Sequence, residues 1–347
     1  MHTRLLLLAL VIGGGIATAA AMGHAQSPDG TRMLKVAIML GPSGRGDPFT
    51  DAALAGLEAA KQRGGLTVVE RLPARPEDYG PTVDALAAEK PDLIIGVGFL
   101  YAEPFRVATA RHPETRFLLL DAALPSVPNL RSVTFRADEG SFLAGVAAAA
   151  ESKRGAVGFI GGMNMPTIQG FECGYEGGIR WAAKELDRVV RGFVVYIGTT
   201  PDAFSRPAGA RELSRAMIAQ QGVDVLYAAA GASGIGVIET ARALNVKAIG
   251  VDVDQRHLAP AVVITSMRKR LDRAVEHAIA DVRARSFRGG AMVMSLANAG
   301  VDLVLPGLLA PATQKLIAKA REAIVRGRIV PCQPPTPAPT WKKRPGN

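Results

Sequence analysis

The chain has 347 residues, of which 48% are hydrophobic and 21% are charged, and its formal net charge is +10 at pH 7. This composition is typical of a globular protein and excludes a largely disordered chain. Nucleic-acid binding is disfavoured because aromatic residues make up only 5% and do not alternate with basic ones, so we expect the charge to lie on solvated helix faces.

The first 25 residues have the pattern of an export signal. A basic start ending at Arg4 precedes an apolar stretch from Leu5 to Ala21 and a small-residue cleavage site at 23–25. No basic stop-transfer cluster follows, and no cysteine lies near the expected cleavage site. We therefore expect a cleaved signal peptide over residues 1–25 and a soluble, periplasmic mature protein.

Short β-rich segments then alternate with alanine-rich helical segments. The expected strands are 34–40, 67–71, 93–97, 117–120, 133–135, 156–160, 192–197, 223–228, 248–251, 262–265, 291–296 and 301–304. The expected helices are 50–63, 81–89, 103–110, 139–153, 167–186, 208–221, 234–244, 268–285 and 312–326. This alternation predicts an α/β fold with doubly wound parallel sheets.

The number of strands suggests two interwoven lobes. We expect a first lobe over 33–136 plus about 266–298, and a second over 137–265 plus about 299–328. A Pro-rich tail over 331–347 is expected to be extended or disordered. A chain that crosses repeatedly between two lobes forms a hinge around a cleft, which suits ligand capture.

The two cysteines, Cys173 and Cys332, leave two interpretations open. They could pair in an oxidising compartment, or Cys173 could be an inert buried thiol. The five histidines are dispersed and none has a metal-ligand spacing with cysteine or carboxylate. We expect neither a metal nor a cofactor.

In the first half, candidate ligand-binding residues follow two strands. Asp47 and Phe49 end a glycine-rich segment that begins at Gly41; Asp47 could cap the next helix, and Phe49 could staple that helix or offer a stacking surface in the cleft. Asp121 follows the strand 117–120 as a turn former or a ligand contact. The glycine spacing fits neither a phosphate-binding loop nor a dinucleotide fingerprint, which disfavours a nucleotide-cofactor enzyme.

In the second half, Gly231 lies in a glycine-rich strand-to-helix turn, and Tyr227 just before it could be a second aromatic surface. Asp252 and Asp254 are two residues apart, so an extended chain would point both to one side. Acid–base or metal chemistry would need further groups, whereas carboxylates alone can accept hydrogen bonds from a vicinal diol. Lys269, expected at a helix start, is either a solvated lysine or a donor to a ligand's ring atoms.

Six phrases taken together resemble one family. They are DPFTDAALAGL, GSFLAGVAAA, FIGGMNMPTIQGFECGYEGG, AAAGASGIGV, GVDVDQ and TSMRKRLD. They are similar to the basic membrane protein family, the substrate-binding components of ABC transporters that include purine nucleoside receptors. The resemblance implies two interwoven lobes of the periplasmic binding protein type I kind, a nucleoside-like solute, an ABC permease as partner, a monomer and no enzymatic activity.

The resemblance also implies roles for single residues. A nucleoside base would lie between two aromatic rings, which match Phe49 and Tyr227. The polar positions of the family match Asp47, Asp121, Asp252, Asp254 and Lys269, with the two acids of the GVDVDQ phrase engaging ribose. The chain departs from the family at Thr50, where asparagine is common, and in a shortened spacing, with only Pro48 between Asp47 and Phe49. Another solute such as a sugar or a purine base, and a sensing role instead of transport, stay open.

Overall fold

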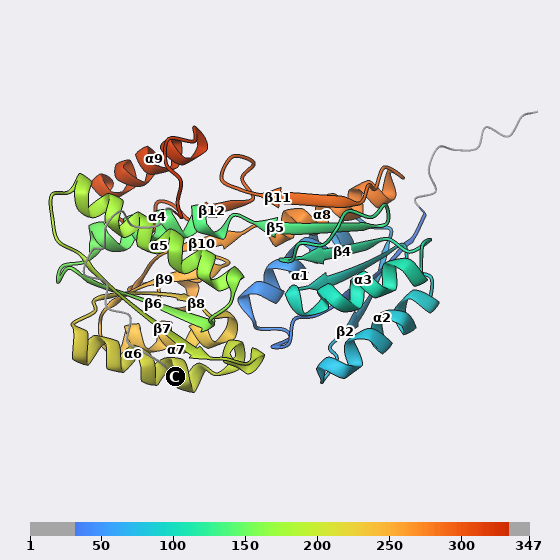
Figure 1. The fold of residues 1–347 in the computed structure, drawn as a ribbon, viewed down its shortest axis with the longest axis horizontal. Coiled ribbons are helices and arrows are strands. Elements are labelled where there is room, and N and C mark those ends of the chain that lie inside the picture. The colour runs from blue at the N-terminus through green and yellow to red at the C-terminus, as the bar shows by residue number, and fades with distance from the viewer. Residues whose placement is uncertain (1–31, 333–347) are drawn as a thin grey trace, which may run out of the picture. The chain divides into compact units, whose positions relative to one another are not determined.

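The computed structural model describes residues 32–332, which from Met33 onward form one compact unit built on two six-stranded sheets (Figure 1). The predicted signal peptide, and all of the Pro-rich tail beyond residue 332, lie outside the described residues. The two sheets and their covering helices confirm the prediction of two α/β lobes.

The first lobe is a parallel sheet with the strand order β11-β5-β4-β3-β1-β2. Its strands are β1 (Leu34–Met39), β2 (Leu66–Arg71), β3 (Leu93–Val97), β4 (Phe117–Leu120), β5 (Leu130–Phe135) and β11 (Gly290–Met294). Its helices are α1 (Pro48–Gln62), α2 (Tyr79–Ala88), α3 (Ala102–Arg111) and α8 (Leu271–Arg283), with the 3-10 helices η1 (Pro76–Asp78) and η2 (Phe99–Tyr101). Helices α1 and α8 share a core with one face of the sheet, and α2 and α3 share a core with the other.

The second lobe has the strand order β12-β10-β9-β8-β6-β7, in which only β12 is antiparallel to its neighbour. Its strands are β6 (Ala156–Met163), β7 (Arg191–Gly198), β8 (Val225–Ala229), β9 (Lys247–Asp252), β10 (Val263–Lys269) and β12 (Val301–Leu303). Its helices are α4 (Ala137–Glu151), α5 (Pro166–Glu185), α6 (Pro207–Gln221), α7 (Gly234–Ala243) and α9 (Pro311–Val325), with η3 (Pro201–Ser205), η4 (Gly231–Ser233) and η5 (Arg256–Leu258).

Both faces of this second sheet are also covered. Along β8, Val225 and Tyr227 pack in the core with α4, α5 and α9, whereas Leu226 and Ala228 pack in the core with α6 and α7. Successive side chains of a strand point to opposite faces, so each face of the sheet needs its own layer of helices. The apolar, non-alternating strand segments of the sequence are the consequence of this double burial.

Within residues 32–332 the chain crosses between the lobes from β5 to α4, from β10 to α8 and from β11 to β12. The sequence predicts the second crossing at about residue 266, but β10 continues to Lys269, so the structure places Ser266–Lys269 in the second lobe. Pairing with β9 and β12 holds these polar residues in the strand, and Arg268 forms an ion pair with Asp302 of β12. The expected helix start at 268 is corrected to Leu271.

Glycines bring α4 and α5 unusually close. A Cβ atom added to Gly145 of α4 would lie 2.1 Å from the carbonyl oxygen of Tyr175, and one added to Gly178 of α5 would lie 2.0 Å from that of Phe142. Side chains larger than hydrogen would therefore separate the helices. This contact accounts for Gly145 in the phrase GSFLAG and for Gly174 and Gly178 in the phrase GYEGG.

Cys173 of α5 and Cys332 form a disulfide with a Cα–Cα distance of 5.2 Å. This pairing settles the two interpretations that the sequence leaves open. The bond ties the segment after α9 to α5, and the carbonyl oxygen of Pro331 would lie 2.3 Å from a Cβ added to Gly177. The end of the described chain is therefore packed directly against that helix.

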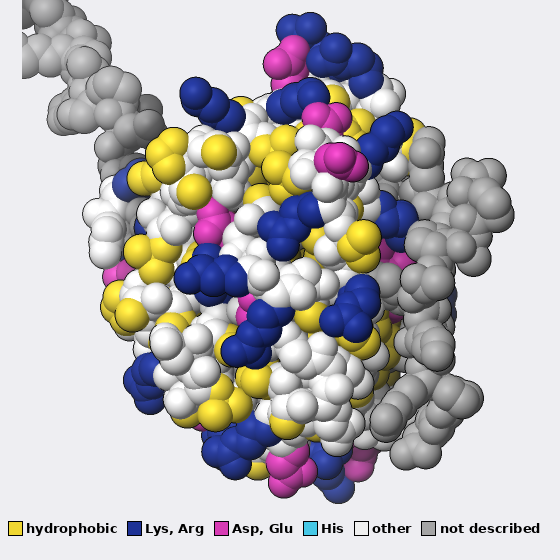
Figure 2. All heavy atoms as spheres, turned by 90° about the vertical axis from the view of Figure 1, so that its left-hand side faces the viewer, with side chains coloured by type: hydrophobic (Ala, Val, Ile, Leu, Met, Phe, Trp, Pro, Cys, Tyr) yellow, Lys and Arg dark blue, Asp and Glu magenta, His cyan; other side chains and the backbone are white. Residues whose placement is uncertain are grey.

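The basic charge is dispersed on the face shown in Figure 2, which is the end of the second lobe. Lys and Arg side chains are spread over this face and are separated by hydrophobic, acidic and other polar groups. Charges arranged in this way are solvated individually and do not form the continuous stripe that tracks a nucleic-acid backbone.

Candidate ligand-binding site

A cavity lies between the two lobes, with about 700 Å³ of space when the open solvent at its mouth is included. Its walls come from the carboxyl ends of parallel strands in both sheets, which is where open α/β sheets bind ligands. Gly41, Val97 and Asp121 lie at the ends of first-lobe strands, and Asp252 and Lys269 lie at the ends of second-lobe strands.

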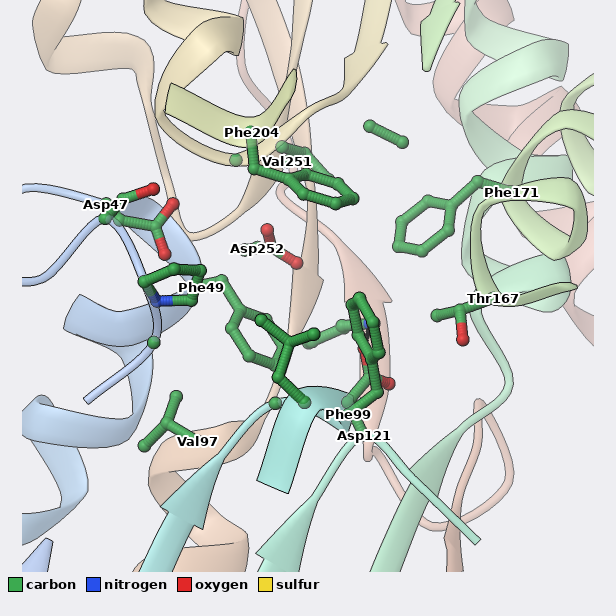
Figure 3. Close-up of a pocket in the computed structure, with 18 residues that line it drawn as sticks. Asp47, Phe49, Val97, Phe99, Asp121, Thr167, Phe171, Phe204, Val251 and Asp252 are labelled. Atoms are coloured by element: carbon green, nitrogen blue, oxygen red, sulfur yellow. Dashed lines mark hydrogen bonds and ion pairs between the residues drawn. The ribbon is translucent and has the colours of Figure 1, made fainter. Parts of the chain in front are cut away.

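Four phenylalanine rings surround the cavity (Figure 3). Phe49 of α1 and Phe99 of η2 belong to the first lobe, and Phe171 of α5 and Phe204 of η3 belong to the second. The rings of Phe99 and Phe204 meet edge to face, with centroids 6.5 Å apart and an interplanar angle of 64°. The lobes therefore contact each other through aromatic rings at the cavity, and the remaining ring faces offer stacking surfaces.

Lys269 lies within this aromatic group. Its ammonium nitrogen is 2.7 Å from Oδ2 of Asp121 and lies 4.8 Å from the ring centroid of Phe171 and 5.2 Å from that of Phe49. Only 3% of Lys269 is exposed. A buried ammonium needs a carboxylate partner, and the aromatic faces add a cation–π attraction.

Asp252 is the last residue of β9, and its backbone lies in the left-handed region with φ of +65°. Only 6% of the residue is exposed. Its Oδ1 is buried and has no hydrogen-bond partner among residues 32–332. Burial raises the pKa of Asp252 to about 7, with the nearby carboxylates of Asp47 and Asp121 acting in the same direction and Lys269 opposing them. The carboxyl group can therefore be present with or without its proton near neutral pH.

Asp47 caps helix α1 and also lines the cavity. Its Oδ2 accepts hydrogen bonds from the backbone N–H and the hydroxyl of Thr50, at 3.1 and 3.0 Å. Its Oδ1 would lie 2.9 Å from a Cβ added to Gly231, so the absence of a side chain at Gly231 lets the second lobe approach Asp47. Burial raises the pKa of Asp47, against the lowering effect of the N–H and hydroxyl of Thr50.

The structure brings most of the predicted site residues together at this cavity. The predicted residues that line it are Asp47, Phe49, Asp121, Gly231, Asp252 and Lys269.

Tyr227 does not line the cavity, and the expectation of a stacking surface there is corrected. The side chain is fully buried in the second lobe, where its hydroxyl lies 2.9 Å from that of Ser141 and its ring lies 5.2 Å from that of Tyr175. The residue is two positions before the end of β8, and its side chain points into the core with α4 and α5. Tyr227 is therefore a packing residue.

Asp254 is also placed away from the cavity. Its carboxylate forms an ion pair with Arg256, which lowers the pKa of Asp254. The expectation that it points to the same side as Asp252 requires an extended chain, but the left-handed conformation of Asp252 turns the chain before it reaches Asp254.

Phe99, Phe171 and Phe204 are the aromatic cavity residues that the sequence did not reveal. Phe171 lies in the second turn of α5, where an aromatic residue on an apolar face looks like any core residue. Phe99 lies two residues after the end of β3, and Phe204 lies in the 3-10 helix that follows β7 in the chain. Their positions after strand ends are the signal that could have revealed them.

Among the described residues, no group of three or more His, Cys, Asp or Glu side chains is arranged to hold a metal ion. Within the same range, none of the helices combines the length and apolar character needed to span a membrane.

A family profile described as "ABC transporter substrate-binding protein PnrA-like" matches residues 34–334. The chain belongs to this Bmp family. The match confirms the resemblance seen in the six sequence phrases, and it makes the protein an ABC transporter substrate-binding protein and not an enzyme.

Two curated relatives and one solved structure illustrate the similarity. The chain is 32% identical over 270 residues to basic membrane protein A of Borreliella burgdorferi, covering 76% of this chain and 77% of the relative. It is 31% identical over 321 residues to the ABC transporter nucleoside-binding protein BmpA of Lactococcus lactis, covering 85% and 88%. An ABC transporter solute-binding protein of Aeropyrum pernix superposes with a TM-score of 0.77 at 27% identity, covering 86% of this chain and 92% of that one.

Proposed function

We propose that this Bmp family member captures a nucleoside-like solute between its lobes in the periplasm and delivers it to the permease of an ABC importer. The observation that carries the proposal is the cavity itself, where phenylalanine rings from both lobes surround buried carboxylates. The relative named as a nucleoside-binding protein supports the same solute class. The predicted export signal at residues 1–25 supports the periplasmic location.

The aromatic rings suit a flat, aromatic part of the solute. Phe49 comes from the first lobe and Phe204 from the second, so a base that stacks on both is held fully only when the lobes are closed. Stacking of a base on an aromatic side chain contributes about 1–3 kcal/mol. A solute that contacts both lobes shifts an open–closed equilibrium toward the closed form.

The charges suit a solute that donates hydrogen bonds. Asp47, Asp121 and Asp252 line the cavity, and Lys269 is the one cation among the described lining residues. Lys269 is already paired with Asp121. Sugar hydroxyls can donate to the carboxylates of Asp252 and Asp47, whereas a phosphate group would meet carboxylates with no cation left to neutralise it.

Calorimetric titration tests this proposal directly. The purified mature protein is titrated with adenosine, guanosine, inosine, uridine and cytidine, and with adenine, D-ribose and adenosine 5′-monophosphate for comparison. We expect at least one nucleoside to bind more tightly than adenine, ribose or the monophosphate. Heat from ribose alone would point to a sugar receptor, heat from adenine alone to a base receptor, and no heat from any of the eight would refute the nucleoside assignment.

Variants connect the binding to the cavity. Phe49→Ala and Phe204→Ala should each weaken nucleoside binding by about 1–3 kcal/mol, because each removes one stacking surface. Phe193→Ala is the matched control, since Phe193 is a half-buried phenylalanine of β7 that does not line the cavity. Equal loss of affinity in all three variants would mean that the effect is not a stacking effect.

A further inference from the structure

The turn that carries Asp252 is strained and contacts both lobes. The backbone N–H of Val253 donates to the carbonyl of Val251 at 2.7 Å, which closes a three-residue turn centred on Asp252. A turn of this size with a positive φ at its centre is rare and strained, and it persists only where its surroundings hold it. Asp252 lines the cavity, and Val253 packs against the core of the first lobe.

Gln255 supplies that support from outside the cavity. Its side-chain Oε1 accepts a hydrogen bond from the backbone N–H of Val251 at 2.8 Å, directly before the strained residue. Its own backbone N–H donates to the hydroxyl of Ser266 in β10 at 3.1 Å. Gln255 is 2% exposed and does not line the cavity. The turn is thus fixed at one side by an amide oxygen and at the other by a neighbouring strand.

Gly250 makes room for this arrangement. A Cβ added to Gly250 would lie 2.4 Å from the hydroxyl of Ser266 and 2.9 Å from Cβ of Gln255. Two separate features of the GVDVDQ phrase, its glycine and its glutamine, therefore serve the orientation of the aspartate between them. The side-chain amide of Gln255 acts through its oxygen alone: Oε1 accepts the hydrogen bond from Val251, and Nε2 has no hydrogen-bond partner among the described residues.

We propose that Gln255 is a positioning residue of the binding site, which holds the turn so that Asp252 faces the cavity and Val253 faces the first lobe. The effect on solute affinity rests on the function proposed above, whereas the orientation of Asp252 can be measured without any solute. Loss of the Oε1 acceptor should let the turn relax and the carboxylate of Asp252 move toward water.

Two pairs of matched variants test this proposal. Gln255→Met removes the acceptor at nearly constant length, and Gln221→Met makes the same change at the end of α6, where Oε1 accepts no hydrogen bond from a described residue. Ser266→Ala removes the second support with a smaller change, and Ser214→Ala deletes an equally buried hydroxyl that bonds only within α6. The second pair keeps the test decisive if Gln255→Met does not fold.

The first readout is the pKa of Asp252, which is measured by carboxyl carbon NMR in protein without added solute. Lys269, Asp47 and Asp121 are the charged groups that act on it, and all four variants leave them in place. In Gln255→Met the pKa should fall from about 7 toward its ordinary value of 3.8. Ser266→Ala should shift it the same way by less, and the two control variants should leave it unchanged.

The second readout is the affinity for the five nucleosides of the panel. Gln255→Met should weaken binding about tenfold, the size expected for one buried hydrogen bond, and the control variants should not. Lowered thermal stability of Gln255→Met and Ser266→Ala with an unchanged pKa of Asp252 would overturn the proposal and leave Gln255 a purely structural residue. If wild-type protein binds no nucleoside while the pKa shifts as expected, only the proposed function fails.

Discussion

The ammonium nitrogen of Lys269 lies 2.7 Å from Oδ2 of Asp121, and this ion pair joins the last residue of β10 in the second lobe to the end of β4 in the first. The lysine side chain is 2% exposed and the aspartate side chain 11% exposed. Charges buried to this degree are stable only as a pair. The ion pair therefore contributes to closure of the lobes as well as to the electrostatics of the cavity.

Lys269→Met should lower the free energy of unfolding by about 3–5 kcal/mol, because it leaves Asp121 buried without its cation. Urea denaturation measures this loss. Lys319→Met is the matched control: Lys319 pairs with Glu185 at the surface with 62% of its side chain exposed, and its loss should cost at most about 1 kcal/mol. Similar losses in the two variants would contradict a special role for the buried pair.

The raised pKa of Asp252 predicts a pH dependence of stability. The folded protein keeps this proton up to about pH 7, whereas the unfolded chain releases it near the ordinary value of 3.8. The folded state binds more protons in that window, so this residue makes stability fall as the pH rises from about 4 to 7. The contribution is at most about 4 kcal/mol at 1.36 kcal/mol for each pKa unit.

Asp252→Asn removes this titration, so the difference in unfolding free energy between the variant and wild type should change across the same window. Urea denaturation at pH 4.5, 6 and 8 measures that difference. Wild type should lose stability relative to the variant as the pH rises. A difference independent of pH would mean that the carboxyl group ionises in the folded protein as it does in water.

The sequence predicted the fold well because each element has a local signal. Buried strands such as 93–97 read as short apolar segments, and the observed β3 has those bounds. The sequence also placed Asp121, Asp252 and Lys269 in the site, and all three line the cavity. Polar residues at the carboxyl ends of parallel strands converge in any open α/β sheet.

The rest of the site depends on tertiary detail. Asp254 was misplaced because one left-handed residue, Asp252, ends the extended chain on which the prediction relied. Tyr227 was misplaced because its side chain faces helices of its own lobe, and that direction is fixed by packing with Tyr175 and Ser141. Phe171 was missed because only the position of the other lobe distinguishes a cavity-facing ring from a core ring.

The disulfide between Cys173 and Cys332 should stabilise the second lobe. It closes a loop of 159 residues in sequence, which restricts the unfolded chain. Cys173→Ser and Cys332→Ser should each lower the free energy of unfolding by about 2–5 kcal/mol. Reducing agent should lower the free energy of unfolding of wild type to that of the serine variants and should leave the variants unchanged. An equal free energy of unfolding for oxidised and reduced wild type would contradict a stabilising disulfide.

The close contact between α4 and α5 predicts opposite effects for the same substitution at two glycines of one helix. Gly178→Ala places a methyl group 2.0 Å from the carbonyl oxygen of Phe142, so the helices must separate, at a cost of about 1–3 kcal/mol.

Gly170→Ala meets nothing within 4 Å and replaces glycine in the same helix by the best helix former, which should stabilise the protein by up to about 1 kcal/mol. Thermal unfolding of both variants checks the pair. A shift of the same sign in both would show that helix propensity, and not the approach of α4, determines the effect of these glycines. Opposite signs would show that Gly178 is needed for the close approach of α4, whereas Gly170 is not.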